Sequence, residues 1–261
     1  MKNLSLSYQE RAKTISHPLA QRLLLLMANK KTNLAVSADL TKKQQLLDLA
    51  EQTGPEICLF KTHIDILEDF DQQFITDLTA IAAHHNFLLF EDRKFADIGH
   101  TVQHQYQHGV YHIADWADII NAHSAPGPSV IQGLRSIGLS KQRGCLLIAN
   151  MSCAGHLMDE EYAAATVAMA IEQQDFVIGF IAQQRLIDTP DFIYMTPGVN
   201  VAVSGDRLGQ NYLSPEQVIL HNGNDVIIVG RGIYQNASPT VAAQQYRKLG
   251  WNAYLQRIKT S

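Results

Sequence analysis

The amino-acid sequence predicts an α/β protein: a single (β/α)8 (TIM) barrel that follows an N-terminal helical extension. Short apolar runs recur along the 261 residues, and most of the stretches between them have helical period. This alternation is typical of parallel strands that are covered by helices. The chain length is also that of one such barrel.

The apolar runs give the expected strands and their order. Eight runs are expected to form strands: Leu34–Val36, Ile57–Phe60, Phe87–Phe90, Ile119–Ile120, Cys145–Ala149, Phe176–Ile181, Phe192–Met195 and Val226–Val229. Segments 42–54, 74–85 and 159–174 carry the helical pattern. No linker rich in Pro, Gly or Ser divides the chain, so we expect residues 1–261 to form one domain, with residues 1–32 as the helical extension. A doubly wound open sheet is the alternative, but its glycine fingerprint is absent after the first run.

The composition limits the classes of binding partner and indicates the cellular compartment. The net charge of −4 and the absence of a basic run disfavour nucleic acid or a membrane as the main partner. The run Leu23–Ala28 is too short to span a bilayer, and no cleavage site of a signal peptide follows it. The three cysteines cannot all pair, and Cys58 and Cys145 lie in apolar runs. These features predict reduced thiols in a cytoplasmic protein.

Polar side chains follow most of the apolar runs. They are Ser37, Asp39, Lys61, His63, Asp92, Lys94, Asn121, His123, Asn150, Ser152 and Arg231. The carboxyl ends of barrel strands meet at one face, where active sites lie. In an extended segment residues i and i+2 point to the same side, so Asp92 and Lys94 are expected to share a direction. The pattern predicts a site at this face.

The densest group of charges follows the run that ends at Phe90. Five charged residues occupy positions 91–97 of a chain that is only 18% charged, and Lys61 reaches the same face from another strand. Rim ion pairs, with Asp97 as a helix cap, are the structural interpretation. In a site, alternating lysines and carboxylates keep both kinds of group charged, which disfavours a Schiff-base lysine. A protonated lysine suits stabilisation and protonation of a carbanion without a metal or an organic cofactor.

Two glycine-bearing segments indicate phosphate binding. Segment 196–216 follows the seventh run, contains three glycines and has the length of a functional lid. A Gly-Arg-Gly sequence at 230–232 follows the eighth run. Glycine allows the backbone to approach an anion, and arginine supplies a fork of donors. The loops after strands seven and eight are the usual phosphate site of these barrels.

Four histidines recur every four residues. They are His100, His104, His108 and His112. Histidines spaced in this way share a helix face and can hold a metal. The segment lacks the glutamate of an HExxH motif, however, and Gly109 is expected to end the helix before His112. Intervening glutamines favour a solvated or interface face, so no metal site is predicted here.

The motifs around these residues resemble the orotidine 5′-phosphate decarboxylase family in its eukaryotic form. FEDRKFADIG at 90–99 is the most specific of them. Shorter motifs follow the family's order over nearly the whole chain: TNLAVSADL, GPEICLFKTHIDIL, WADIINAHSAPG, RGCLLIANMS, TPGV, GDRLGQNY and DVIIVGRGI. The resemblance implies a cofactor-free barrel, a homodimer with shared active sites, that makes uridine 5′-phosphate and carbon dioxide in the last step of UMP biosynthesis. The length predicts the monofunctional form, without the orotate phosphoribosyltransferase domain that animals fuse to it.

The resemblance also implies the roles of individual residues. Lys94 is the implied proton donor to C6 of the pyrimidine, and the implied catalytic tetrad is Lys61, Asp92, Lys94 and Asp97. The implied substrate-binding residues are Ser37, Asp39, Ile98, Thr101, Ser152, Pro197, Gln210, Tyr212, Gly230 and Arg231. Asp97, Ile98 and Thr101 cross into the partner's site in this family. By the same resemblance, Ser37 and Ser152 are expected to lie near the pyrimidine and Asp39 near the ribose. Gln210, Tyr212 and Arg231 are expected to hold the phosphate.

The sequence departs from the family's motifs at two positions, and three other functions are alternatives to the decarboxylase. Asn150 stands where the family commonly has a glutamate and Cys153 where it has a serine, both beside Ser152. A related sugar-phosphate decarboxylase or aldolase is disfavoured by the implied pyrimidine contacts of Ser152 and Gln210. A catalytically inactive nucleotide-binding barrel is disfavoured by the intact tetrad. A metal-dependent hydrolase built on the histidines is the third alternative.

Overall fold

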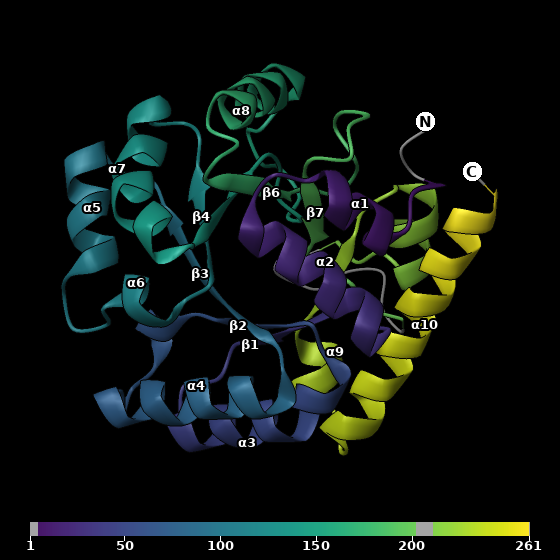
Figure 1. The fold of residues 1–261 in the computed structure, drawn as a ribbon. Coiled ribbons are helices and arrows are strands. Elements are labelled where there is room, and N and C mark those ends of the chain that lie inside the picture. The colour runs from purple at the N-terminus through teal and green to yellow at the C-terminus, as the bar shows by residue number, and fades with distance from the viewer. Residues whose placement is uncertain (1–4, 202–210, 261) are drawn as a thin grey trace.

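The computed structural model describes residues 5–201 and 211–260, which contain a closed barrel of eight parallel strands (Figure 1). The strands are β1 (Leu34–Ala38), β2 (Leu59–Thr62), β3 (Leu88–Phe95), β4 (Ile119–His123), β5 (Gly144–Ile148), β6 (Val177–Ile181), β7 (Ile193–Thr196) and β8 (Val226–Val229). Each strand pairs with the next along the chain, and β8 pairs with β1. The predicted fold class is confirmed, and the open-sheet alternative is wrong.

Helices surround the barrel and join most of the strands. They are α1 (Tyr8–Thr14), α2 (Pro18–Lys30), α3 (Lys43–Thr53), α4 (Gln72–His85), α5 (Gly99–Gln107), α6 (Ile113–Trp116), α7 (Pro128–Gly138), α8 (Glu160–Glu172), α9 (Arg231–Tyr234) and α10 (Pro239–Thr260). Shorter turns are η2 (Gly54–Glu56), η3 (Ile64–Ile66), η4 (Leu139–Lys141) and the π-helical η5 (Gln217–His221). Residues 182–192 join β6 to β7 without a helix. None of the helices described is long and apolar enough to cross a membrane.

The first two helices form the expected N-terminal extension. α2 lies across the amino ends of the strands, where Leu19 packs against Gly144 at the start of β5 (Figure 1). α1 packs against α10, because Tyr8 stacks on Tyr254 with ring centroids 4.0 Å apart. The extension therefore covers the end of the barrel opposite the predicted site.

The strands are buried on both faces, which explains their continuous apolar sequences. Every residue of β1, β2 and β5 to β8 is buried. A strand packed between helices and the barrel interior has no solvent face that would select alternating polar residues. Close contact between β6 and β7 also requires glycine at position 179, because a Cβ there would lie 1.8 Å from the carbonyl oxygen of Ile193.

Strand β3 extends further than the sequence predicted. The predicted strand ended at Phe90, whereas β3 continues to Phe95 and includes most of the charged cluster. Its register against β4 shifts between Glu91 and Phe95, and Lys94 has a left-handed backbone with φ of 51°. A bulge of this kind redirects the side chains of a strand, and it commonly occurs beside active sites. Asp92 and Lys94 thus lie at the carboxyl face, where they line a cavity.

A buried ion cluster joins the terminal helices to β8. The Asp225 carboxylate is fully buried and contacts Arg11 of α1, Arg185 and Arg257 of α10. Burial would raise the pKa of Asp225, but the three guanidinium groups outweigh it and hold that pKa below its ordinary value. An unpaired charge at this depth would be costly, so the cluster is important for closing the amino end of the barrel.

Candidate active site

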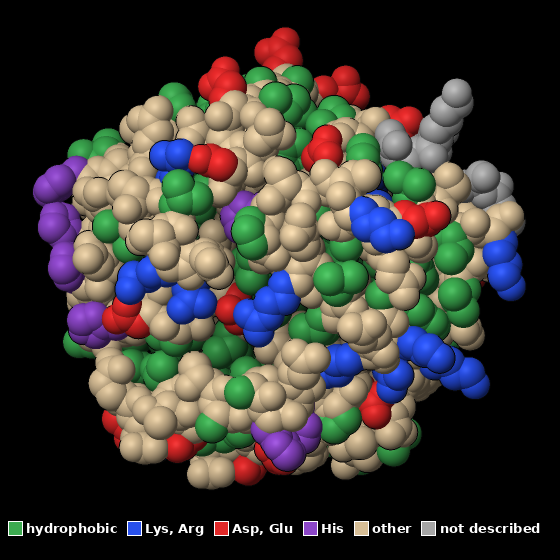
Figure 2. All heavy atoms as spheres, in the orientation of Figure 1, with side chains coloured by type: hydrophobic (Ala, Val, Ile, Leu, Met, Phe, Trp, Pro, Cys, Tyr) green, Lys and Arg blue, Asp and Glu red, His purple; other side chains and the backbone are tan. Residues whose placement is uncertain are grey.

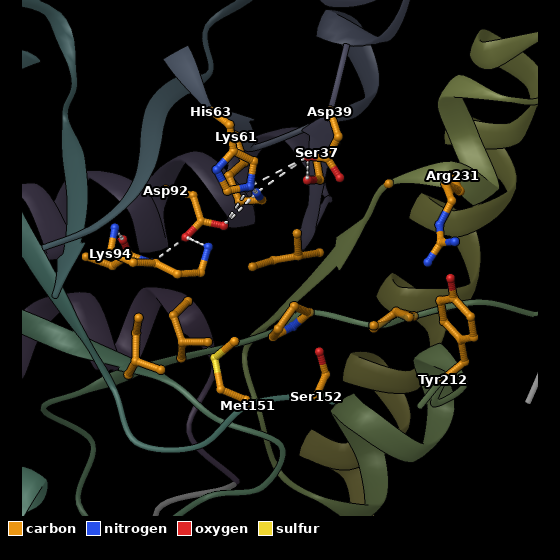
Figure 3. Close-up of a pocket in the computed structure, with 18 of the residues that line it drawn as sticks. Ser37, Asp39, Lys61, His63, Asp92, Lys94, Met151, Ser152, Tyr212 and Arg231 are labelled. Atoms are coloured by element: carbon orange, nitrogen blue, oxygen red, sulfur yellow. Dashed lines mark hydrogen bonds and ion pairs between the residues drawn. The ribbon is translucent and has the colours of Figure 1, made fainter. Parts of the chain in front are cut away.

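The carboxyl ends of the strands enclose one cavity, which is lined by many of the predicted site residues (Figure 3). The predicted residues that line it are Ser37, Asp39, Lys61, Asp92, Lys94, Ser152, Pro197, Tyr212, Gly230 and Arg231. They lie far apart in the sequence and converge because parallel strands all end at the same face. The predicted convergence of these side chains at one face of the barrel is therefore observed, and the assignment of this cavity as the active site stays a prediction.

Asp92 is the centre of the charged network. Its side chain is 11% exposed and accepts hydrogen bonds from Lys61 Nζ and Lys94 Nζ, each at 2.7 Å. Burial would raise the pKa of Asp92, but the two ammonium groups dominate and hold it well below its ordinary value. One ionised carboxylate thus fixes two lysines from different strands in the same cavity.

Asn121 of β4 holds the bulge that carries Lys94. Its Oδ1 accepts from the backbone N–H of Lys94 at 2.7 Å, and its Nδ2 donates to Asp92 Oδ1 at 2.6 Å. A left-handed backbone costs a non-glycine residue about 1–2 kcal/mol, so it persists only where its surroundings stabilise it. These two hydrogen bonds join the strained residue to its carboxylate partner.

His63 extends the network beyond Lys61. Its Nε2 lies 2.9 Å from Lys61 Nζ and 3.3 Å from Asp92 Oδ2. Burial, followed by the charge of the Lys61 ammonium, lowers the pKa of His63 below its ordinary value. The ring is therefore neutral at pH 7 and can accept a hydrogen bond from Lys61 through Nε2.

Ser37 and Asp39 form the β1 side of the cavity. Ser37 Oγ donates to Asp39 Oδ1 at 2.8 Å, and Lys61 Nζ lies 3.8 Å from the same oxygen. The Asp39 side chain is 43% exposed, in contrast to Asp92. Asp39 is thus held by its neighbours while one edge of its carboxylate faces the open cavity.

Glu91 and Arg93 point away from the cavity. Glu91 is fully buried and accepts hydrogen bonds from Thr62 Oγ1 at 2.6 Å and from the backbone N–H of Ile64 at 3.1 Å. Burial raises the pKa of Glu91 to about 8. Arg93 places its guanidinium over the ring of Phe95. Adjacent charges of this strand therefore serve different environments.

The opposite end of the cavity carries Arg231 and Tyr212. Figure 3 shows both on the side away from Lys94, and the Arg231 guanidinium carbon lies 5.8 Å from the Tyr212 ring centroid. A Cβ at Gly232 would lie 2.5 Å from the Tyr246 hydroxyl, so a larger residue there would have to displace the Tyr246 side chain. Gln210 lies outside the described residues.

Three predicted residues do not reach this cavity. Asp97 and Ile98 are exposed on the rim, where Asp97 Oδ1 accepts from the backbone N–H of Ile98 at 2.7 Å. Thr101 is partly exposed near the start of α5. The apolar residue Ile98 is 63% exposed on this rim.

The two departures from the family pattern have different surroundings. Asn150 Oδ1 accepts from the backbone N–H of Gln183 at 2.8 Å, which joins the ends of β5 and β6. Cys153 is a partly exposed free thiol. Ser152 lines the cavity, and its carbonyl oxygen accepts from the backbone N–H of Asn211. Asn150 therefore supports the loop after β5 through its contact with Gln183.

The spaced histidines form a row on the surface over α5 (Figure 2). α5 ends at Gln107 and His112 is the residue that precedes α6, which confirms the predicted break. His100 Nε2 and His104 Nε2 lie 3.3 Å apart, and the His104 ring stacks on His108. The row lies outside the cavity.

The sequence-based set of site residues missed several that line the cavity. His63 and Asn121 were noted as polar strand ends but received no role, because nothing in their local sequence shows that both reach Asp92. Ile148, Met151 and Val199 form apolar wall, and apolar side chains at strand ends give no chemical signal. Among the described residues that line the cavity, no three His, Cys, Asp or Glu side chains converge closely enough to hold a metal.

Comparisons with a family model and with related sequences point to the same family. Residues 32–246 match the model of the orotidine 5′-phosphate decarboxylase / HUMPS family. The orotidine 5′-phosphate decarboxylase of Phycomyces blakesleeanus is 51% identical over 99% of this chain and 98% of its own length. That of Schizosaccharomyces pombe is 49% identical over 97% of this chain and 96% of its own. Bovine uridine 5′-monophosphate synthase is 51% identical, but the match spans 93% of this chain and only 51% of the bovine protein.

Solved structures agree on the fold. Orotidine 5′-monophosphate decarboxylase from Methanocaldococcus jannaschii, in complex with the inhibitor BMP, superposes with a TM-score of 0.67 at 20% identity. The superposition covers 84% of this chain and 98% of that protein. The enzyme from Pyrococcus horikoshii gives 0.64 at 18% identity, covering 83% and 98%. At this level of identity the likeness supports the barrel alone.

Proposed function

The chain belongs to the orotidine 5′-phosphate decarboxylase family and decarboxylates orotidine 5′-phosphate to uridine 5′-phosphate in pyrimidine biosynthesis, and we propose that the network around Asp92 performs this reaction. The observation that carries the proposal is the pair of lysines that Asp92 holds in one cavity. Identity of about half to decarboxylases along nearly the whole chain argues against the sugar-phosphate alternatives.

In the proposed mechanism Lys94 stabilises and protonates the carbanion. The bond between C6 and the carboxylate breaks, carbon dioxide leaves, and an electron pair remains in the plane of the ring at C6. No adjacent carbonyl can delocalise that pair, so a fixed positive charge is the available source of stabilisation. The Lys94 ammonium supplies it and then gives a proton to C6, after which solvent restores the proton to Lys94. Electrostatic stabilisation of this kind is stronger in a cavity that excludes water.

Asp92 and Lys61 position that ammonium. Because Asp92 holds Lys94 Nζ and Lys61 Nζ through different oxygens, the charge lies in place before the substrate arrives. Pre-organisation avoids the cost of reorienting dipoles as the carbanion forms. Asn121 contributes by fixing the Lys94 backbone.

The substrate would span the cavity from Lys94 to Arg231. We place the pyrimidine near Lys94, Ser37 and Ser152, and the ribose near Asp39. The phosphate would lie at the other end, with Arg231, Tyr212, Gly230 and Pro197, and with Gln210 from the segment that is not described. The support for this orientation is the position of Arg231 and Tyr212 across the cavity from Lys94 (Figure 3). Phosphate binding far from the reacting carbon can supply energy for closure and for the transition state.

A homodimer would complete each site. Asp97, Ile98 and Thr101 lie on the rim, turned from their own cavity, and Ile98 exposes an apolar side chain that a partner would cover. We propose that Asp97 enters the partner's site near the substrate carboxylate, where repulsion between like charges raises the energy of the bound substrate. Ile98 and Thr101 would cross with it. A cytoplasmic location, without nucleic acid as a partner, fits the charge of −4.

A direct assay tests the proposal. Purified protein with a metal chelator is expected to consume orotidine 5′-phosphate, followed by the change in pyrimidine absorbance. The Lys94→Ala variant is the matched control, because it removes the proposed proton donor and leaves Arg231 and Tyr212 in place. Absence of turnover in folded wild-type protein would refute the assignment and favour an inactive nucleotide-binding barrel.

A further inference from the structure

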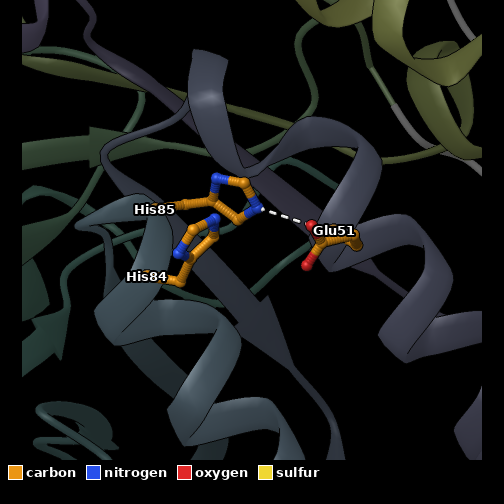
Figure 4. Close-up of side chains that lie close together, drawn as sticks. All are labelled: Glu51, His84 and His85. Carbon is orange, nitrogen blue, oxygen red and sulfur yellow. Dashed lines mark ion pairs between the residues drawn. The ribbon is translucent and has the colours of Figure 1, made fainter.

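Outside the catalytic cavity, two histidines and a glutamate converge on the helical surface. Within residues 5–201 and 211–260, one group of three His, Cys, Asp or Glu side chains offers ligand atoms that all lie within 4.8 Å of one another. It consists of Glu51 on α3 and of His84 and His85 at the end of α4 (Figure 4). We propose that these three side chains bind a divalent transition-metal ion such as Zn²⁺.

The distances suit a small tetrahedral ion. Zinc binds histidine nitrogen and carboxylate oxygen at about 2.0–2.2 Å, so two ligands across a tetrahedral angle lie about 3.4 Å apart. His85 Nε2 and Glu51 Oε1 lie 3.0 Å apart, close to that separation. His84 is exposed, so rotation of its side chain can bring its ring to the same point. Two histidines and one glutamate make a ligand set that occurs in zinc enzymes, with a fourth position for water.

His85 is held in the orientation that the ion requires. Its ring lies over Gly54, where an added Cβ would come within 2.6 Å of the ring. Its carbonyl oxygen accepts from Lys30 Nζ at 2.7 Å, which fixes the backbone. His85 Nε2 is shielded from solvent and forms no hydrogen bond of acceptable geometry with any residue that the structure describes, although Glu51 lies beside it. A shielded ring nitrogen directed at a carboxylate is pre-organised for a metal, because no other donor or acceptor competes for it.

The Lys30 ammonium lies beside this group, at the carbonyl oxygen of His85. Its ammonium donates to the carbonyl oxygens of Gly54, His85 and Asn86, at distances of 2.7–3.0 Å. The ammonium is thus directed to backbone oxygens, and the Glu51 carboxylate remains available to the metal.

The location indicates what the metal would do. α4 ends at His85, just before β3 begins at Leu88, whereas Lys94 lies near the other end of that strand. At about 3.3 Å per residue the two sites are roughly 20 Å apart. The ion would clamp α3 to α4 at the amino end of the barrel, where features serve stability rather than catalysis. Binding to the folded state alone stabilises it in proportion to the logarithm of free metal concentration.

The histidine row on α5 is the competing site and has to be removed first. His100 Nε2 and His104 Nε2 are 3.3 Å apart, which also suits two ligands of one zinc ion. The starting protein is therefore His104→Ala, without an affinity tag and stripped of metal by a chelator. Into it are introduced His84→Ala or Glu51→Gln, both at exposed positions where loss of fold is not expected. His221→Ala, an exposed histidine elsewhere, is the matched control.

Zinc alone is the probe. Its binding is measured by competition with a chromophoric chelator, and its effect on the unfolding temperature by thermal unfolding. His104→Ala protein is expected to bind one equivalent and to unfold at a higher temperature when zinc is present. Adding His84→Ala or Glu51→Gln should weaken binding at least about tenfold and abolish the rise, whereas His221→Ala should change neither. Failure of the His104→Ala protein to bind zinc would overturn the proposal, as would binding that both ligand substitutions leave unchanged. Cobalt absorbance typical of tetrahedral coordination would support it independently.

Discussion

Glu91→Gln tests whether a buried neutral carboxyl supports the catalytic strand. Glu91 is fully buried next to Asp92 and contacts Thr62 and Ile64, which flank His63 at the end of β2. Burial raises its pKa to about 8, so the carboxyl is mostly protonated at pH 7. Glutamine has nearly the same shape as a protonated glutamate, keeps the carbonyl acceptor and carries an NH2 donor in place of the hydroxyl. The substitution should therefore preserve the fold and the position of Lys61.

The magnitude follows from proton linkage. The ordinary pKa of this carboxyl is 4.5 and the folded value is about 8. Each tenfold change in proton affinity corresponds to about 1.4 kcal/mol, so the full effect is about 5 kcal/mol. The folded state binds the proton more tightly than the unfolded chain. The stability that this provides is complete below about pH 4.5, falls as the pH rises to about 8, and is level above that value.

The assay is urea unfolding of wild-type and Glu91→Gln protein at pH 5, 7 and 9. The two proteins should have similar unfolding free energies at pH 5, and the variant should become the more stable as the pH rises, with the difference approaching about 5 kcal/mol at pH 9. Glu172→Gln, an exposed substitution, is the control and should show no such trend. A difference between wild-type and Glu91→Gln that is the same at all three pH values would refute the reasoning, because Glu91 would then not titrate between them.

Three further predictions concern the proposed active site, the proposed homodimer and the buried ion cluster. Lys94→Ala should lower turnover about a thousandfold or more while uridine 5′-phosphate still binds, measured by steady-state kinetics and calorimetry; substantial residual turnover would remove Lys94 from its proposed role. Mixing Lys94→Ala with Asp97→Ala protein should restore about a quarter of wild-type activity, since half of the dimers gain one intact site; no recovery after confirmed subunit exchange would contradict a shared site. Asp225→Asn should lower the unfolding free energy by about 3–5 kcal/mol, because three guanidinium groups lose their partner. Asp48→Asn on the exposed face of α3 should change it by about 0.5 kcal/mol at most.

The barrel could be predicted because strands that are buried on both faces have continuous apolar sequences. Each of the eight apolar runs corresponds to a strand, although the ends differ by a few residues. The polar strand ends could also be predicted to converge, since parallel strands in a barrel share one direction. Both conclusions rest on patterns within short segments.

The details of the site depend on contacts between segments that are distant in sequence. The rule that residues i and i+2 share a direction correctly predicted that Asp92 and Lys94 lie together. The rule alone does not explain their contact. The left-handed backbone of Lys94 and the bulge in β3 make the contact, and Asn121 of another strand holds them. The Glu51 group was missed for the same reason, since α3 and α4 bring together residues that no motif connects.

The density of charge in β3 follows from the different directions that one bulged strand gives to its side chains. Glu91 faces the protein interior, Asp92 and Lys94 face the cavity, Arg93 covers Phe95, and Asp97 lies on the rim. A regular strand has only two faces, so it could not send adjacent charges into so many environments. The bulge permits this at the cost of a strained residue, and that residue is Lys94 itself. Hydrogen bonds from Asn121 of β4 hold the strained backbone of Lys94 and its partner Asp92. The position of the Lys94 ammonium therefore depends on neighbouring strands as well as on β3.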